Sequence, residues 1–377
     1  MNKSFTASIL LLGISCLPAR ADMTVGVLVG ATGPGASLGI PYKNAFSILP
    51  PTLGGEKVRY IILDDGTDPS TAVKNARKLI SEEKVDVLIG STSVPTATAV
   101  VEVASELKTP HIALSPVAAP PSKLGWTFPI PQPVPVMMEV VVEHMKANKV
   151  KTVGYIGFSD SWGDLVFKGF ASQAEPAGMR IVANERFARA DTSVTAQTLK
   201  IISTHPDAVV LGGSGTPGAL PHMALVERGY KGPIYHNHGV INKDFLRVGG
   251  KAVEHAMAPT GPVMVAEQLP DNNPIKKVAL EFTKAYEATY GAGSRNAFAA
   301  YSYDAYLRLA QAVPAALKKA KPGTPEFRAA LREALENSKE VVGTHAVYNT
   351  TSADHNGVDK RSRVLVEAVN GEWKLVK

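Results

Sequence analysis

Cysteine is almost absent from this chain of 377 residues, because Cys16 is its only one. Cys16 lies in a stretch that has the parts of an export signal: the basic Lys3, an apolar run over residues 9–17, and Ala19-Arg20-Ala21, a small-x-small pattern typical of cleavage by signal peptidase. We expect residues 1–21 to be a cleavable signal peptide, which leaves an exported chain without a thiol or a disulfide.

Cys16 could also be the anchor cysteine of a lipoprotein. A lipoprotein signal usually has leucine three positions before its cysteine, whereas Gly13-Ile14-Ser15 precedes Cys16 here. The sequence therefore favours a cleaved chain that begins at Asp22 over an anchored one.

Long apolar runs are lacking beyond residue 21. A membrane helix needs roughly 18 consecutive apolar residues, and the longest apolar stretches here, such as residues 134–142, are interrupted by proline or charge. We expect no membrane-spanning segment in the exported chain.

Charge of one sign is not concentrated anywhere in the sequence. The formal net charge is +6, and removal of Lys3 and Arg20 with the leader lowers it to +4. The basic residues are scattered, and no basic stripe with interleaved aromatic residues occurs, so we expect no nucleic acid among the partners. The 356 residues after the leader exceed the size at which one core usually keeps growing, so two lobes are expected.

What the sequence contains is an alternation of strand and helix patterns. Short β-branched runs bounded by glycine, proline or aspartate recur in the first third, with segments of helical spacing between them. Asp68 and Pro69 suit the N-cap and first position of one such helix. Strands are expected at residues 24–30, 58–65, 85–90 and 111–115, and helices at residues 41–49, 69–83 and 96–107. This alternation predicts a parallel sheet with helices on both faces.

The alternation restarts after residues 129–135, a proline-rich stretch that cannot propagate a helix and suits a crossing between lobes. Pro259-Thr260-Gly261-Pro262 suggests another crossing. For the rest of the chain we expect a helix ending near residue 148, strands at residues 152–158, 180–187, 208–212 and 233–236, helices at residues 163–175, 193–204, 217–228, 274–290, 297–316 and 325–336, and a hairpin of residues 363–369 and 372–376 around Asn370-Gly371.

Three expected crossings mean that each lobe combines separated segments of chain. We expect the first lobe to contain residues 22–134 and 262–343, and the second lobe residues 135–261 and 344–377. The predicted fold class is α/β, with two doubly wound, Rossmann-like lobes joined by a hinge of three crossings.

The loops after the expected strands carry a specific set of motifs. They are Thr32-Gly33-Pro34, Asp64-Asp65 with Asp68-Pro69, Gly90 with Ser93, Ser115-Pro116, Gly212-Gly213 and the helical Tyr301-Ser302-Tyr303-Asp304-Ala305-Tyr306. In this order and spacing the exported chain resembles the type I periplasmic solute-binding proteins of ABC transporters, in particular the Leu/Ile/Val-binding receptors for branched-chain amino acids. The resemblance implies two lobes that close on a ligand, a location in the periplasm, and ABC-transporter permease subunits as partners; we expect a monomer.

The start of the helix expected at residues 96–107 gives the first candidate binding residues. Hydroxyls of Ser93 and Thr96 could join unpaired backbone N–H groups and the helix dipole in binding an anion, although Ser93 could equally be only a helix cap. The resemblance implies that Ser93 holds the carboxylate of the ligand. It also implies that Ser115, Val117 and Ala119 belong to the second half of this cradle.

The sequence departs from the family pattern where an amino-acid ligand would place its ammonium group. The family has a threonine at the position of Ala119 and a carboxylate at the position of His238. Alanine offers no acceptor and histidine offers at best a neutral one, so a buried ammonium there would cost several kcal/mol. An α-amino ligand is therefore disfavoured.

The remaining candidates favour a flat organic acid, best interpreted as an aromatic carboxylate such as a benzoate or phenylpropenoid. Stacking on tryptophan or tyrosine would hold an aromatic ring, and a histidine could hydrogen-bond a second polar group. Tryptophan could instead be hinge packing, and either histidine an ordinary buried one. These candidates are Leu38 and Ser214, which replace family tyrosines, together with Trp162, Tyr303, His236 and His238.

Catalytic and metal-binding interpretations have weaker support. Gly213-Ser214-Gly215 is not a nucleophile elbow, because Thr216 stands where the last glycine belongs, and residues 30–35 do not fit the dinucleotide-binding spacing. His222, His236 and His238 could ligate a metal, but alternate residues of a strand share one face with or without metal. The sequence thus predicts a receptor without enzymatic activity, cofactor or metal.

Three functions stay open: a transport receptor for an organic acid, which is favoured, a transport receptor for an amino acid or amide, and a periplasmic ligand sensor. In the expected mechanism the first lobe offers its carboxylate cradle. Trp162 and the loops of Ser214 and His238 in the second lobe then close over the ligand.

Overall fold

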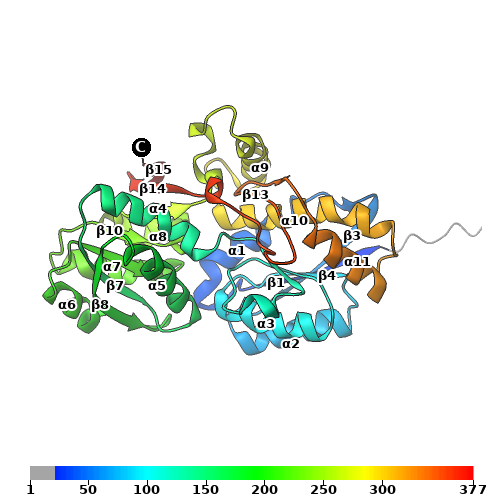
Figure 1. Cartoon of the computed structure of the whole chain (residues 1–377), viewed down its shortest axis with the longest axis horizontal. Helices are drawn as coiled ribbons and strands as arrows, with labels where there is room; N and C mark the ends of the chain where they lie inside the picture. Colours follow the sequence, from blue (N-terminus) through cyan, green and yellow to red (C-terminus); the bar gives the residue numbers. More distant parts are fainter. Residues whose placement is uncertain (1–21, 377) are drawn as a thin grey trace, which may run out of the picture.

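The computed structural model describes residues 22–376 and arranges them as two α/β lobes that lie side by side (Figure 1). The predicted signal peptide, residues 1–21, lies outside the described residues. Within residues 22–376, no helix has the length and apolar character needed to cross a membrane.

The first lobe is built on a six-stranded sheet in the order β2-β3-β1-β4-β5-β6, in which all neighbours are parallel except β2 and β3. The parallel sheet predicted for this part of the chain is confirmed, and β2 and β6 are short additions to it. The strands are β1 (Met23–Val29), β2 (Thr52–Leu53), β3 (Glu56–Asp64), β4 (Val87–Ile89), β5 (His111–Ala113) and β6 (Thr127–Pro129).

Helices cover both faces of this sheet, as predicted. Alternate residues of β1 divide between two cores, because successive side chains of a strand point to opposite faces. Val27 packs with α1 (Ala36–Ala45), α10 (Ala297–Leu317) and α11 (Pro325–Glu336). Leu28 packs on the other face with α2 (Pro69–Ser81) and α3 (Val94–Glu106).

The second lobe contains a seven-stranded sheet in the order β15-β14-β11-β10-β9-β7-β8, parallel from β8 to β11 and antiparallel at β14 and β15. Its strands are β7 (Thr152–Phe158), β8 (Arg180–Phe187), β9 (Ala208–Gly212), β10 (Ile234–His236), β11 (Met257–Thr260), β14 (Val364–Val369) and β15 (Glu372–Leu375). Its helices are α4 (Val134–Ala147), α5 (Ser161–Ala174), α6 (Thr195–Ser203), α7 (Ala219–Glu227) and α8 (Lys243–Gly249).

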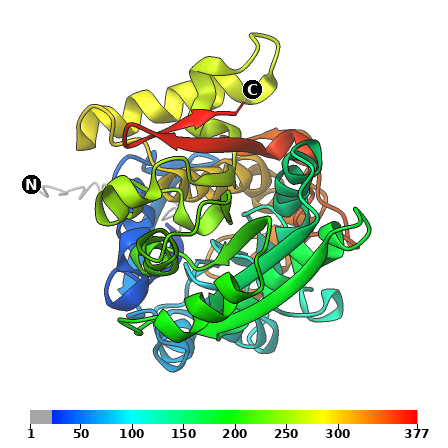
Figure 2. The same cartoon turned by 90° about the vertical axis from the view of Figure 1, so that its left-hand side faces the viewer.

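The predicted terminal hairpin closes one edge of this sheet. Figure 2, with the second lobe toward the viewer, shows β14 and β15 in red beside α9 (Pro274–Tyr290). Asn370 and Gly371 in the turn both have positive φ, of 55° and 74°, as a two-residue type I′ turn requires.

The starts of α2 and α1 can be compared with the starts predicted from the sequence. Asp68 accepts a hydrogen bond from the backbone N–H of Thr71 at 2.7 Å and Pro69 opens α2, as predicted. The predicted start of the first helix at residue 41 was wrong, because α1 begins at Ala36 and carries Pro41 in its interior. A proline there removes only one backbone hydrogen bond, which the packing of α1 against α10 offsets.

Three crossings connect the lobes. The first crossing comprises residues 130–133 between β6 and α4, the second comprises residues 261–273 between β11 and α9, and the third comprises residues 359–363 before β14. The prolines of the first crossing delay a helix until Val134, as expected, and α4 carries a proline in its first turn.

The segment after residue 343 differs from the division that we expected. Ala346 and Tyr348 belong to the same core as Val27 in the first lobe. The antiparallel pair β12 (Val341–Val342) and β13 (Val347–Tyr348) returns the chain to α10 before it crosses. The second lobe therefore resumes after this pair rather than at residue 344, and the other lobe boundaries stay predictions.

Candidate functional site

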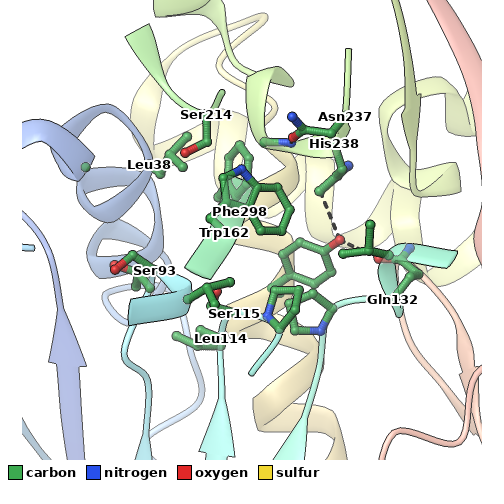
Figure 3. Close-up of a pocket in the computed structure, with 18 of the residues that line it drawn as sticks. Leu38, Ser93, Leu114, Ser115, Gln132, Trp162, Ser214, Asn237, His238 and Phe298 are labelled. Atoms are coloured by element: carbon green, nitrogen blue, oxygen red, sulfur yellow. Dashed lines mark hydrogen bonds between the residues drawn. The ribbon is translucent and has the colours of Figure 1, made fainter. Parts of the chain in front are cut away.

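A pocket lies between the two lobes beside the first crossing (Figure 3). It holds about 690 Å³ of empty space, including the part that is open to solvent. Its walls come from loops and helix starts that follow the parallel strands of both sheets, together with α10 and α4. Ligands of open α/β sheets bind at these carboxyl ends of the strands, so the position is that of a ligand site.

The two lobes touch beside this pocket. The backbone N–H of Thr216 in the second lobe donates to Ser37 Oγ on α1 at 3.2 Å. Gly215 has a φ of +60°, and a Cβ at this position would lie 2.8 Å from the same Ser37 oxygen. Glycine therefore allows the loop to approach α1 this closely, and the lobes are in a closed arrangement.

Ser93 faces the pocket from the start of α3, immediately before Val94 (Figure 3). Its Oγ lies 2.7 Å from Thr96 Oγ1, and its backbone N–H donates to the same oxygen at 3.3 Å. Thr96 is fully buried, also donates to Ser91 Oγ at 2.8 Å, and does not line the pocket. Ser93 therefore sits at the helix start and at the pocket wall, with Thr96 behind it.

The loop after β5 brings only its first residues to the pocket. Ser115 lines the pocket, Val117 lines a neighbouring groove, and Ala119 lines neither. The backbone N–H of Ala118 donates to Thr98 Oγ1 at 2.9 Å, which directs the loop along α3 and away from the pocket. Ala119 therefore does not face a ligand in this pocket, and the prediction that it belongs to the cradle was wrong.

Arg189 is a pocket residue that the sequence patterns did not indicate. It follows β8, and its Nη1 donates to Ser214 Oγ at 3.2 Å. Its Nε donates to Asp160 Oδ2 at 2.5 Å, and its guanidinium lies 4.3 Å from the centroid of the Phe158 ring. Ser214, which we expected in the site, thus contacts a cation that can bind an anionic ligand.

Trp162 lines the pocket from the first turn of α5, as Figure 3 shows. Asp160 caps this helix and accepts from the backbone N–H groups of Trp162 and Gly163, at 2.9 and 3.2 Å. The indole Nε1 donates to Gly213 O at 3.4 Å. Leu38 on α1 also lines the pocket, so both of these predicted residues lie at the site.

His238 and Gln132 line the same side of the pocket (Figure 3), and Tyr301 contacts both of them. His238 Nε2 is 2.9 Å from the Tyr301 hydroxyl, which donates to Gln132 Oε1. Burial lowers the pKa of His238 to about 4, so the ring is neutral near pH 7. The Tyr301 hydroxyl thus contacts both the Gln132 amide and Nε2 of the neutral His238 ring.

Two other predicted residues, His236 and Tyr303, do not line the pocket. His236 ends β10 whereas His238 begins a 3₁₀ turn. The two histidines therefore do not lie on one face of a strand, as their spacing had suggested. His236 is buried against His222, with 2.8 Å between His236 Nε2 and His222 Nδ1. Within residues 22–376 no group of three or more metal-ligating side chains is assembled.

Tyr303 lies on the far side of α10 from Tyr301. Residues two apart on a helix point in directions about 200° apart, so only one of the two can face the pocket. Tyr303 packs against Phe282, with ring centroids 5.3 Å apart. The pocket takes its tyrosines from Tyr301 and from Tyr42 on α1.

Comparisons with known proteins show the family of this chain. Residues 22–367 match the family model described as periplasmic binding protein. The chain belongs to the periplasmic binding protein family. An extracellular ligand-binding receptor from Rhodopseudomonas palustris is 48% identical, with a TM-score of 0.93 over 95% of this chain and 100% of the other.

More distant relatives share the family or the fold. Leu/Ile/Val-binding protein homolog 3 of Brucella melitensis is 24% identical over 337 residues, which cover 86% of this chain and 85% of the relative. A solute-binding protein of an ABC transporter from Rhodopseudomonas palustris BisB5 is 20% identical with a TM-score of 0.75, over 94% and 96% of the two chains, and shows the fold alone. The chain is thus a solute-binding receptor of the ABC-transporter type in a family of receptors rather than enzymes.

The binding-protein family pattern did not reveal every residue that lines the pocket. Arg189 had no usable signal, because an isolated arginine after a strand resembles any surface arginine. Met137 and Met138 lie within residues 134–142, a stretch that we considered only as a possible membrane helix. The residues that the sequence patterns missed include Tyr42, Thr92, Leu114, Gln132, Met137, Met138, Arg189, Asn237, Phe298 and Tyr301.

Proposed function

We propose that this periplasmic receptor captures a small organic acid, best represented by an aromatic carboxylate, and delivers it to an ABC-transporter permease. The observation that carries the proposal is the charge of the pocket. Arg189 is the only charged side chain that lines it among the described residues, and no aspartate or glutamate does. An arginine beside hydroxyls suits a carboxylate, whereas an ammonium group would find no opposite charge.

Hydroxyl groups from both lobes surround the place where a carboxylate would bind. Ser93 and Ser115 belong to the first lobe, and Ser214 belongs to the second lobe with Arg189. A carboxylate between them would accept hydrogen bonds from both sides of the pocket. Its negative charge would therefore favour the closed arrangement over the open one.

The remaining walls favour a flat apolar body. Trp162, Tyr42, Phe298 and Tyr301 supply aromatic rings, and Met137 and Met138 supply polarisable side chains. Aromatic rings gain about 0.5–1.5 kcal/mol from stacking in addition to the area that they bury. The BisB5 protein of similar fold is described in complex with 3,4-dihydroxybenzoic acid, which is an observation about that protein.

An amino acid is the second candidate, because the Brucella relative is named as a homologue of Leu/Ile/Val-binding proteins. Neutral oxygens of Gln132 and Asn237 could accept from an ammonium group. Both already accept hydrogen bonds, from Tyr301 and from the backbone N–H of Gly239. The pocket therefore favours an acid that lacks an amino group.

The proposal is tested by thermal shift and calorimetry with benzoate, cinnamate, hexanoate, benzamide and leucine. A ligand at 100 times its Kd stabilises the folded chain by about 2.7 kcal/mol, which raises the Tm by several degrees. We expect benzoate or cinnamate to raise the Tm most. Benzamide separates charge from shape, because it keeps the ring and lacks the negative charge.

Two other outcomes would each contradict a different part of the proposal. A Tm shift with leucine alone would overturn the aromatic-acid assignment and favour the amino-acid receptor. Equal shifts with benzoate and benzamide would show that Arg189 does not select for charge.

A further inference from the structure

We infer that Tyr301 is a latch between the lobes, and that it sets the balance between the open and closed forms even without ligand. Tyr301 lies on α10 in the core of the first lobe, with 1% of its surface exposed. Its hydroxyl is directed out of that lobe. It donates to Gln132 in the first crossing and is hydrogen-bonded to His238 Nε2 in the second lobe, at 2.9 Å.

The ring of Tyr301 is fixed by the histidines around it. It stacks on His345, with centroids 3.8 Å apart and planes inclined by 14°. The His238 ring lies edge-on to it, with ring centroids 5.5 Å apart and planes inclined by 75°. The His345 ring contacts the second crossing, because a Cβ on Gly261 would lie 1.8 Å from its Nδ1. The tyrosine therefore has little freedom to follow His238 when the lobes separate.

The hydrogen-bond chain continues to the third crossing. Gln132 Nε2 donates to the backbone carbonyl of Ser362 at 2.6 Å. Gln132 and His238 are themselves almost completely buried, with 2% and 8% of their surfaces exposed. His238, Tyr301, Gln132 and Ser362 thus form one connected series that touches both lobes and two crossings.

This hydrogen-bond series is complete only when the lobes are closed, because the contact between His238 and Tyr301 joins the two lobes. Buried polar groups need partners, and a bond between parts that move relative to one another favours the form in which it is made. When the second lobe moves away, water replaces His238 at the tyrosine hydroxyl. The Tyr301 hydroxyl therefore stabilises the closed form for any ligand, which goes beyond the choice of ligand proposed above.

Tyr155 offers a matched control. It is a buried tyrosine of β7 that does not line the pocket. Its hydroxyl donates to Gly163 O at 2.7 Å, inside the second lobe. Removal of this hydroxyl deletes a buried hydrogen bond without affecting a contact between lobes.

Disulfide trapping measures closure without ligand. Ser37 and Thr216 lie on opposite lobes, do not line the pocket, and come within 3.2 Å between Ser37 Oγ and the Thr216 nitrogen. Cysteines at these two positions come near one another only when the lobes touch, so a disulfide between them reports the closed form. Cys16→Ser removes the only other cysteine, so the rate of disulfide formation under a fixed oxidant reports how often the lobes close.

We expect Tyr301→Phe to slow this trapping by about fivefold, the loss typical of one hydrogen bond. Tyr155→Phe should leave the rate within about twofold, because its hydrogen bond lies inside one lobe. His238→Leu should slow trapping to a similar extent. Adding His238→Leu to Tyr301→Phe should cause little further loss, because both remove the same contact. Thermal unfolding of each variant verifies that it is folded.

The inference is overturned if folded Tyr301→Phe closes as often as the parent, or if Tyr155→Phe slows trapping equally. Fully additive losses from Tyr301→Phe and His238→Leu would also contradict a shared contact. No ligand enters this experiment, so a failure of aromatic acids to bind would leave its result unchanged.

Discussion

Arg189 and Asp160 form an ion pair at the wall of the pocket, with 2.5 Å between Arg189 Nε and Asp160 Oδ2. The same aspartate caps α5 and accepts from the backbone N–H of Trp162 at 2.9 Å. The carboxylate of Asp160 thus positions both the Arg189 guanidinium and the Trp162 indole. The first two predictions test the roles of Arg189 and Asp160.

Replacement Arg189→Gln should weaken binding of aromatic carboxylates by about 10- to 100-fold, because a hydrogen bond to a charged group contributes about 1.5–3 kcal/mol. Binding of benzamide should change little. Calorimetric titration of both ligands measures the difference.

Arg186→Gln is the matched control for that experiment. Arg186 also lies on β8 and places its guanidinium 5.2 Å from the Tyr155 ring, but it does not line the pocket. Equal losses in the two variants would refute a specific role for Arg189.

Replacement Asp160→Ala should lower the free energy of unfolding by about 1–2 kcal/mol, because α5 loses its N-cap. Asp160→Asn should cost less, since asparagine is also a good N-cap. Urea unfolding compares the two variants. The cap assignment is wrong if Asn destabilises the chain as much as Ala does.

Replacement Trp162→Leu should reduce the affinity for benzoate relative to hexanoate by about three- to tenfold, because stacking contributes about 0.5–1.5 kcal/mol. Trp162→Phe keeps a ring and should retain most of the preference. The ratio of the two Kd values is the measurement. Proportional losses for both acids would mean that Trp162 serves packing alone.

Acid should destabilise the folded chain between pH 6.5 and pH 4. Burial lowers the pKa of His111, His222 and His238 from 6.5 to about 4, so the unfolded chain binds more protons in this range. The stabilisation from these neutral histidines is therefore fully present above pH 6.5 and is lost as the pH falls toward 4. Burial raises the pKa of Asp304 to about 6 and also raises the pKa of Asp65 and Asp86, which opposes this trend. Burial lowers the pKa of His236 and His345 as well, which adds to the trend.

Differential scanning calorimetry at pH 7.5 and pH 5 checks this prediction. We expect the Tm to fall on the order of 5 °C, from the net uptake of protons on unfolding. A Tm that is constant or higher at pH 5 would show that these histidines are not buried in neutral form.

The fold was predictable because its signals are local. The pattern of residues 274–290 predicted α9, and Asn370-Gly371 predicted the turn of the terminal hairpin. The start of α1 was missed because proline can occur inside a helix as well as at its beginning. The return of Tyr348 to the first lobe had no local signal, since it depends on packing against α10.

The candidate site was predictable where a residue lies in the loop after a strand or in the first turn of the helix that follows. Ser93, Ser115 and Ser214 are of the first kind, Leu38 and Trp162 are of the second kind, and all line the pocket. Ala119 was misplaced because a hydrogen bond from its neighbour to α3 directs the loop away.

The sequence by itself determined the alternating strands and helices and hence the family, because hydrophobic periodicity and turn residues act over a few positions. Only the tertiary structure decided that Arg189 supplies the charge of the pocket and that Tyr301, rather than Tyr303, faces it. Residues from β8, α10 and the crossings meet through the closure of two lobes. No spacing along the chain encodes that meeting, because it depends on the packing of elements far apart in sequence.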